Sequence, residues 1–148
     1  MIYESFSQED TFRIGYEAGK LAKKGQFYCL VGDLGVGKTI FTKGFAQGLG
    51  IIEDITSPTF TIVNVYDTGR LPFYHFDVYR IEDLYEMEEI GYEEYFYGEG
   101  VSFVEWGNLI RELFPKEYVE ITIKKELEQG FDYRIVEVKE FRHENTRN

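Results

Sequence analysis

Cysteine is nearly absent from the sequence, and so are long apolar segments. The single cysteine, Cys29, excludes an intramolecular disulfide, and its place in an apolar run indicates a small buried hydrophobic side chain. No stretch approaches the ~20 apolar residues that a membrane-spanning helix needs. The first ten residues lack a basic start followed by an apolar run, so we expect no secretory signal and a cytoplasmic location.

Basic residues are also scarce. Lys and Arg number 16 against 27 Asp and Glu, which gives a net charge of -11. A protein that grips nucleic acid by itself presents a basic face to the phosphates. The charge balance therefore argues against direct binding, and if RNA is involved we expect a partner protein to hold it.

The size and composition are those of one soluble globular domain. The chain has 148 residues, of which 43% are hydrophobic and 29% charged. We expect a single domain over residues 1–148, with a loose polar tail from about Phe141. Helical and strand patterns alternate throughout, which indicates an α/β fold with a mostly parallel or mixed sheet flanked by helices.

The helix and strand patterns give definite ranges. One helix begins at the cap Ser7 and ends before Gly25, and others cover residues 38–49, 82–96 with a break at Gly91, and 108–114. The expected strands cover residues 26–31, 59–67, 71–79, 101–105, 118–124 and 131–138. The second and third strands are expected to form a hairpin, and the last two an antiparallel closing pair.

Residues 32–39 read Gly-Asp-Leu-Gly-Val-Gly-Lys-Thr and match G-x-x-x-x-G-K-[ST], the phosphate-binding loop. The run follows an expected strand and opens an expected helix, which is the context that the motif requires. The glycines let backbone N–H groups approach phosphates closely. Lys38 brings positive charge to the β- and γ-phosphates, and the Thr39 hydroxyl binds Mg²⁺. The predicted nucleotide-binding residues are Asp33, Leu34, Gly35, Val36, Gly37, Lys38 and Thr39.

A phosphate loop needs a carboxylate across the Mg²⁺, and two acids that end apolar strands are candidates. These are Asp77, at the end of residues 71–77, and Glu105, at the end of residues 101–105. We assign Glu105 to the metal and Asp77 to the metal-bound or attacking water, although the two roles could be exchanged. Lys38, Asp77 and Glu105 are thus the expected residues of catalysis.

Two aromatic residues lie next to these acids. His75 precedes Asp77 by two positions, and a lone strand histidine is more often a core or supporting residue than a base. Trp106 follows Glu105 and either packs on the nucleotide or fills the core.

The loop, together with Ser57-Pro58-Thr59-Phe60-Thr61, His75-Phe76-Asp77-Val78-Tyr79-Arg80 and Glu105-Trp106, resembles the TsaE family, formerly called YjeE. The likeness covers about residues 7–138. It implies a P-loop NTPase-like fold and a small bacterial ATPase that uses ATP and Mg²⁺ in the synthesis of threonylcarbamoyladenosine in tRNA. It further implies a switch at Ser57, Pro58 and Thr59 that senses the nucleotide. It also implies two partner proteins that carry out the transfer, so that tRNA is contacted only indirectly.

The sequence identifies the residues that recognise the nucleotide base less clearly than those that bind the phosphates. No Asn-Lys-x-Asp occurs, which disfavours a GTPase, and adenine follows from the resemblance alone. The start of the first helix near Thr11 and the loop at residues 126–132 are the segments that we expect near the base.

Two other functions stay open. A small-molecule kinase uses the same loop, but the clustered lid arginines of such kinases are missing, because the seven arginines are scattered. A non-hydrolysing, nucleotide-gated binding module is disfavoured by the two acids.

Residues 82–99 are strongly acidic and contain no Lys or Arg. Either this is a solvated face, or it is a docking surface for a basic protein partner. The second hypothesis rests on apolar residues that are more numerous than one core face needs: Leu84, Tyr85, Met87, Ile90, Tyr92, Tyr95 and Phe96.

Overall fold

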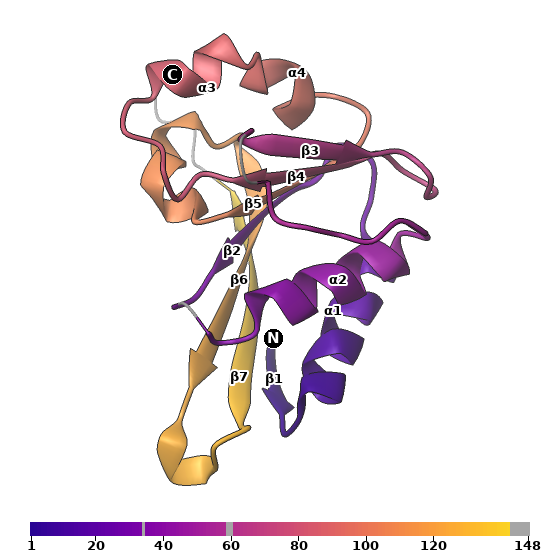
Figure 1. The fold of residues 1–148 in the computed structure, drawn as a ribbon, viewed down its shortest axis with the longest axis vertical. Helices are drawn as coiled ribbons and strands as arrows, with labels where there is room; N and C mark the ends of the chain where they lie inside the picture. The colour runs from indigo at the N-terminus through magenta and orange to yellow at the C-terminus, as the bar shows by residue number, and fades with distance from the viewer. Residues whose placement is uncertain (34, 59–60, 143–148) are drawn as a thin grey trace.

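The computed structural model describes residues 1–33, 35–58 and 61–142, and these form a seven-stranded mixed sheet with helices on both faces (Figure 1). The strand order is β1-β7-β6-β2-β5-β4-β3. The strands are β1 (Ile2–Ser5), β2 (Phe27–Val31), β3 (Val63–Tyr66), β4 (Phe73–Asp77), β5 (Val101–Glu105), β6 (Glu117–Lys125) and β7 (Arg134–Arg142).

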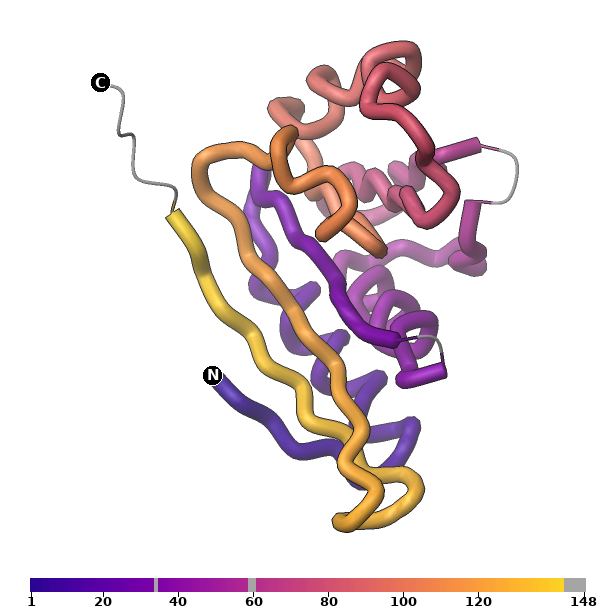
Figure 2. The backbone as a smooth tube through the Cα atoms, turned by 90° about the vertical axis from the view of Figure 1, so that its left-hand side faces the viewer, coloured from indigo at the N-terminus to yellow at the C-terminus, as the bar shows by residue number. Residues whose placement is uncertain are grey.

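The centre of the sheet is parallel and its edges are antiparallel. Strand β2 pairs in parallel with both β5 and β6, and β4 pairs in parallel with β5. The pairs β1 with β7, β6 with β7 and β3 with β4 are antiparallel. Figure 2 shows the first strand, in indigo, beside the last, in yellow. The expected α/β fold with a mixed sheet, a hairpin and an antiparallel closing pair is confirmed.

Alternation along β2 divides the core in two. Tyr28 and Leu30 face the cluster under α1 (Gln8–Leu21) and α2 (Lys38–Gly48), while Phe27 and Cys29 face the opposite cluster. That second cluster is covered by α3 (Tyr85–Glu89), α4 (Tyr92–Phe96) and the 3₁₀ helix Gly107–Leu113. A further 3₁₀ turn, Leu127–Gln129, joins β6 to β7. Cys29 is buried as expected, and burial raises the pKa of its thiol to about 12.

Two ends of the fold differ from the expectation. Strand β1 has no counterpart among the expected strands. Strand β7 continues through Arg142, and Phe141 stacks on Tyr118 with ring centroids 5.1 Å apart, so Phe141 and Arg142 belong to the sheet and not to a loose tail. The rest of the expected tail, residues 143–148, lies outside the described residues.

Helix α1 begins where the sequence predicts. The Ser7 side chain accepts a hydrogen bond from Asp10 N at 3.1 Å, and Asp10 Oδ2 accepts one from Phe6 N at 2.9 Å. The two side chains therefore satisfy backbone donors reciprocally, as in a capping box.

The other end of α1 is capped from a distant part of the chain. Arg70, in the β3–β4 connection, directs Nη2 at the carbonyl oxygens of Gly19, Lys20 and Ala22, at 2.8, 2.8 and 2.9 Å. A cation at a helix C-terminus satisfies carbonyls that have no partner within the helix and interacts favourably with the helix dipole.

Replacement of Arg70 by Met is expected to lower the free energy of unfolding by about 1–2 kcal/mol, because charge-assisted hydrogen bonds to α1 are lost. Urea denaturation followed by circular dichroism measures the difference. Arg13→Met is the control, since its ion pair with Asp10 is 3.5 Å long and 69% exposed on the arginine side, and surface pairs contribute at most about 1 kcal/mol. Equal effects of the two substitutions would refute the capping role.

Helices α1 and α2 touch through glycines. A Cβ atom at Gly15 or Gly19 of α1 would lie closer than 3.0 Å to the backbone of Phe41 or Phe45. A Cβ at Gly44 or Gly48 of α2 would likewise meet the backbone of α1. The two helices therefore pack backbone to backbone, and α2 is held firmly against α1.

The acidic segment is less apolar on its surface than the sequence suggests. Met87 and Phe96 are fully or almost fully buried, and the other apolar residues that pack in the same cluster are Leu84, Ile90, Tyr92 and Tyr95. Of the apolar residues on which the docking hypothesis rested, Tyr85 is exposed. Tyr97, in the same acidic segment, is exposed as well. Most of these apolar side chains therefore pack wholly or partly in the core, two exposed tyrosines lie among the acids, and the docking hypothesis stays a prediction.

Within the described part of the chain, no helix is long and apolar enough to cross a membrane.

Candidate nucleotide site

The glycine-rich loop lies between the end of β2 and the start of α2, at the carboxyl end of the parallel strands (Figure 1). Gly35 and Gly37 have φ of 80° and 108°, values that favour glycine. A Cβ at Gly35 would meet no atom of the described residues within 4 Å. The loop is tied to β7, because Arg134 Nε donates to Val36 O at 2.9 Å. Leu34 lies outside the described residues.

Lys38 is the first residue of α2 and its side chain turns back over the loop. Its Nζ donates to Gly32 O at 2.7 Å and lies 3.6 Å from the centre of the Trp106 ring. Burial lowers the pKa of the ammonium, and three nearby carboxylates oppose this: Glu105, Asp77 and Asp33. The cation is thus held near negative groups and partly removed from water.

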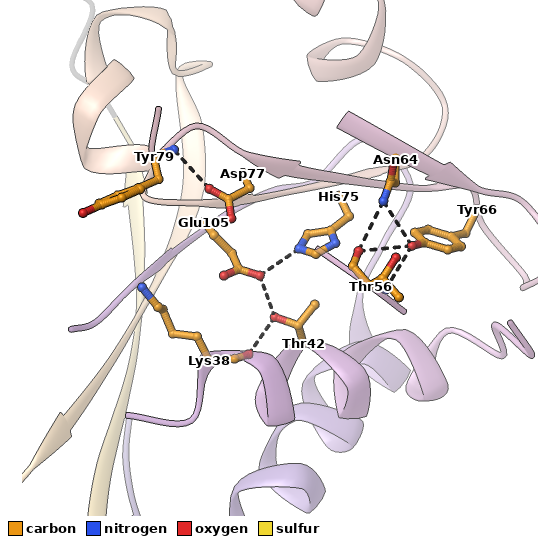
Figure 3. A network of polar contacts seen from close by, with 9 residues as sticks. All are labelled: Lys38, Thr42, Thr56, Asn64, Tyr66, His75, Asp77, Tyr79 and Glu105. Carbon is orange, nitrogen blue, oxygen red and sulfur yellow. Dashed lines mark hydrogen bonds and ion pairs between the residues drawn. The ribbon is translucent and has the colours of Figure 1, made fainter. Parts of the chain in front are cut away.

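The two predicted carboxylates are neighbours in the sheet. Asp77 ends β4 and Glu105 ends β5, and the two residues are paired in the parallel β4–β5 ladder. Figure 3 shows both side chains on the α2 side, near Lys38. The structure therefore brings together three residues that are far apart in the sequence.

Glu105 is 5% exposed and is held by two other side chains. Its Oε2 lies 2.8 Å from His75 Nε2 and 3.4 Å from Thr42 Oγ1 (Figure 3). Sequence reasoning placed His75 near the site as a supporting residue but missed its contact with Glu105, and it missed Thr42 altogether. The signals for both were available: His75 shares a strand face with Asp77, and Thr42 lies one helical turn after Lys38.

Asp77 is less enclosed, and its Oδ1 accepts a hydrogen bond from Tyr79 N at 3.0 Å. Burial raises the pKa of its carboxyl. The Tyr79 hydrogen bond opposes the rise, the charge of Glu105 adds to it, and His75 and Lys38 act against it. The carboxyl therefore takes up a proton at a higher pH than an exposed aspartate does.

Replacement of Asp77 by Asn is expected to stabilise the nucleotide-free fold at neutral pH. Because the folded pKa lies above the ordinary value of 3.8, the folded protein binds this proton more tightly than the unfolded chain. The free energy of unfolding attributable to Asp77 therefore falls as the pH rises from the unfolded pKa through the folded one, and the charge disfavours the fold above both.

Urea denaturation tests this. We expect a higher midpoint for Asp77→Asn than for the wild type at pH 7, and a difference that shrinks as the pH approaches about 4. Asp67→Asn, at an exposed position of the β3–β4 connection, is the control. A midpoint for Asp77→Asn at or below the wild-type value at pH 7 contradicts the assignment.

The predicted switch borders the same site. Ser57 and Pro58 line a cleft of about 430 Å³ together with Asp77 and Tyr79. The third residue of the predicted switch, Thr59, lies outside the described residues. Thr39 is exposed in the first turn of α2, one residue after Lys38.

The segments proposed to lie near the base have different surroundings. Thr11 is 3% exposed, its hydroxyl bonds to Ser5 Oγ at 2.7 Å, and its methyl lies 3.8 Å from where a Cβ at Gly37 would be. The Thr11 side chain therefore lies against Gly37 of the glycine-rich loop. The loop at residues 126–132 joins β6 to β7, next to the Arg134 contact with the loop.

Trp106 packs in the core, one of its two expected roles, and its packing on the nucleotide stays a prediction. It packs against the second core cluster and against Tyr79, with ring centroids 4.7 Å apart, and its ring face covers the Lys38 ammonium. Among the described residues it is the one non-glycine with positive φ, 63°. This conformation turns the chain sharply after Glu105 into the 3₁₀ helix Gly107–Leu113.

In the ranges that the structure describes, no group of three or more His, Cys, Asp or Glu side chains is placed to hold a metal ion. A protein-only metal centre is therefore not formed by these residues. Mg²⁺ in nucleotide sites usually takes one or two protein ligands and completes its shell with phosphates and water. The exposed Thr39 hydroxyl and the Glu105 carboxylate are two oxygen groups of the kind that such an ion takes from the protein.

A phosphate loop between a central parallel strand and a helix, with acids at the ends of the neighbouring strands, defines an α/β protein of the P-loop NTPase-like class. The family model described as "Threonylcarbamoyl adenosine biosynthesis protein TsaE" matches residues 5–135. The chain belongs to the TsaE family.

Individual relatives agree with this assignment. The chain is 50% identical over 123 residues to the tRNA threonylcarbamoyladenosine biosynthesis protein TsaE of Bacillus subtilis, covering 83% of this chain and 77% of the relative. It is 47% identical over 120 residues to the protein of that name from Treponema pallidum, covering 81% and 88%. The crystal structure of Bacillus subtilis YdiB superposes with a TM-score of 0.76 at 42% identity, covering 95% of this chain and 84% of that one.

Proposed function

We propose that the protein binds Mg-ATP and hydrolyses it in support of threonylcarbamoyladenosine synthesis in tRNA, acting in the cytoplasm with two partner proteins. The observation that carries the proposal is the meeting of Lys38, from a phosphate loop, with the carboxylates at the ends of β4 and β5. Membership of the TsaE family supports the pathway, and the names of the relatives support tRNA modification. The net charge of -11 supports contact with tRNA through partners.

Each residue has a distinct task in this proposal. The loop backbone and Lys38 bind the phosphates, with the Lys38 ammonium exchanging Gly32 O and the Trp106 face for phosphate oxygens. Asp77 accepts a hydrogen bond from the attacking water and orients it, which positions the nucleophile. Tyr79 N fixes the Asp77 carboxylate through Oδ1. Ser57 and Pro58, beside Asp77, sense whether the γ-phosphate is present.

The residues present fit Mg²⁺ when it arrives with the nucleotide. Thr39 and Glu105 are the side chains that would hold the ion. When bound, Mg²⁺ would supply charge that stabilises the phosphate oxygens as the terminal bond breaks.

A hydrolysis assay with and without the two partner proteins tests the proposed activity. We expect slow release of inorganic phosphate from ATP by the protein alone and faster release when the partners are added. Single-turnover conditions separate a slow chemical step from slow product release. Binding of ATP without phosphate release under either condition would indicate a gated binding module, and transfer of phosphate to a small acceptor would indicate a kinase.

Glu105→Gln is expected to raise the Mg²⁺ concentration needed for nucleotide binding by about 10-fold or more, because the substitution keeps the shape of the side chain but removes its charge. Nucleotide affinity measured without metal should change much less. Asp77→Asn is the matched variant, and it should reduce hydrolysis with little effect on the metal requirement. The reverse pattern would show that the roles of the two carboxylates are exchanged.

A further inference from the structure

The hydrogen bonds of Glu105 are one-sided. Both hydrogen bonds between its side chain and the described residues end on Oε2, the partners being His75 Nε2 at 2.8 Å and Thr42 Oγ1 at 3.4 Å. In Figure 3 the other carboxylate oxygen points to the side of Lys38. One oxygen is therefore tethered, and the other faces the candidate nucleotide site.

Histidine supplies the proton of this tether. The Thr42 hydroxyl has one hydrogen, and its shorter contact, 2.8 Å, is with Lys38 O. A carboxylate only accepts hydrogen bonds, so the bond to Oε2 is donated by His75 Nε2. The other ring nitrogen, Nδ1, has no hydrogen-bond partner among the described residues. Among the described residues, Glu105 is thus the hydrogen-bond partner of the His75 ring.

The ring is held in one orientation. His75 is 1% exposed and stacks on Phe73 at 5.9 Å with planes 16° apart. Phe103, its neighbour across the β4–β5 ladder, meets the ring edge to face at 6.1 Å. Packing on two sides prevents rotation, so the donor is preorganised for Glu105 before any ligand arrives.

From this geometry we infer that His75 is a positioning residue for Glu105: it holds Oε2 so that Oε1 is presented to the Mg²⁺ that enters with the nucleotide. The inference rests on the proposed function. Groups that orient a metal ligand change metal affinity by about 10- to 100-fold when they are removed. The alternative is a structural role, in which His75 donates a hydrogen bond to the buried Glu105 carboxylate and affects only the stability of the fold.

Variants of matched shape separate the two roles. His75→Phe keeps a ring between Phe73 and Phe103 but removes the donor. His75→Gln places an amide N–H near the position of Nε2, and His75→Asn carries the same amide one methylene shorter, where it does not reach Glu105. The readout is the Mg²⁺ concentration that gives half-maximal binding of a non-hydrolysable ATP analogue, measured by calorimetry, with analogue affinity in EDTA and the urea midpoint recorded for each variant.

We expect His75→Phe and His75→Asn to raise the half-saturating Mg²⁺ concentration by about 10-fold or more, and His75→Gln to stay within about 3-fold of the wild type. Affinity for the analogue in EDTA should not change. In a Glu105→Gln background, His75→Phe should not raise the metal requirement further, because the group through which it acts is already altered.

The outcomes are distinct. If the wild type binds the analogue without any dependence on Mg²⁺, the proposed function fails. If the wild type depends on Mg²⁺ but His75→Phe and His75→Asn match it, or if the effects of His75→Phe and Glu105→Gln add fully, the positioning role is overturned. Should His75→Phe not fold, the Gln and Asn pair decides: equal metal requirements overturn the inference, and a higher requirement for Asn supports it.

Discussion

Lys38→Ala is expected to reduce ATP turnover by about 100-fold or more, since one preorganised cation is removed from the transferred phosphate. The fold should survive. The variant loses the hydrogen bond to Gly32 O and a contact with the Trp106 ring worth about 0.5–1 kcal/mol. It also removes an ammonium whose pKa is lowered by burial and whose charge therefore disfavours the fold. We expect these opposing effects to keep the free energy of unfolding within about 1 kcal/mol of the wild type.

Phosphate release under single-turnover conditions, with the partner proteins present, is the measurement. Lys43→Ala is the matched control, because Lys43 lies on the same helix and is exposed. It should retain wild-type turnover. Undiminished turnover in Lys38→Ala, or an equal loss in both variants, would remove Lys38 from the site.

Gly44→Ala is expected to destabilise the protein by about 3 kcal/mol or more, at the upper end of overpacking effects. In an ordinary helix interior the same substitution stabilises by about 1 kcal/mol, because alanine has the better helix propensity. The sign is reversed here because a Cβ at Gly44 would lie closer than 3.0 Å to the backbone of Phe12 in α1, and two helix backbones have little freedom to yield.

Thermal and urea denaturation of Gly44→Ala and Gln47→Ala make the comparison. Gln47 is exposed on the same helix, and its replacement should change the free energy of unfolding by no more than about 0.5 kcal/mol. A stabilised Gly44→Ala variant would mean that the two helices separate readily. Because the phosphate loop leads directly into α2, we also expect weaker nucleotide binding by Gly44→Ala at temperatures where it remains folded.

The sequence was informative where the signal is local. The phosphate loop is eight consecutive residues between a strand and a helix, and every part of that signal is adjacent in the chain. The placement of Asp77 and Glu105 at one edge followed from a general property of parallel strands, whose carboxyl ends meet. Both inferences needed no knowledge of which side chains touch.

The contacts that support the site were not local. The tether between His75 and Glu105 depends on the register of β4 against β5, and a shift of one residue would turn His75 to the other face. Strand β1 is four residues long and its first three are exposed, so it has no pattern of its own and exists through pairing with β7. Neither the contact between His75 and Glu105 nor strand β1 can therefore be predicted from a short stretch of sequence.

The burial of the apolar residues in the acidic segment could not be predicted for a different reason. A continuous helix over residues 82–96 would spread its apolar side chains over more than half of its circumference, more than one core face covers. Gly91, with φ of 70°, divides the segment into the two short helices α3 and α4, and apolar side chains of both pack in one core cluster. The break was predictable from the sequence, but the packing of both helices in one cluster was not.

The position of β2 in the sheet has a consequence for how the glycine-rich loop reaches its native position during synthesis. The strand that leads into the phosphate loop has two neighbours, β5 and β6, and both lie in the last third of the chain. Pairings between distant segments form slowly, because a long loop must close before any contact rewards it. As the chain emerges from the ribosome, the glycine-rich loop is therefore synthesised well before the two strands that flank β2. We therefore expect the loop to reach its native position only after β6 has been made, when most of the chain is already synthesised.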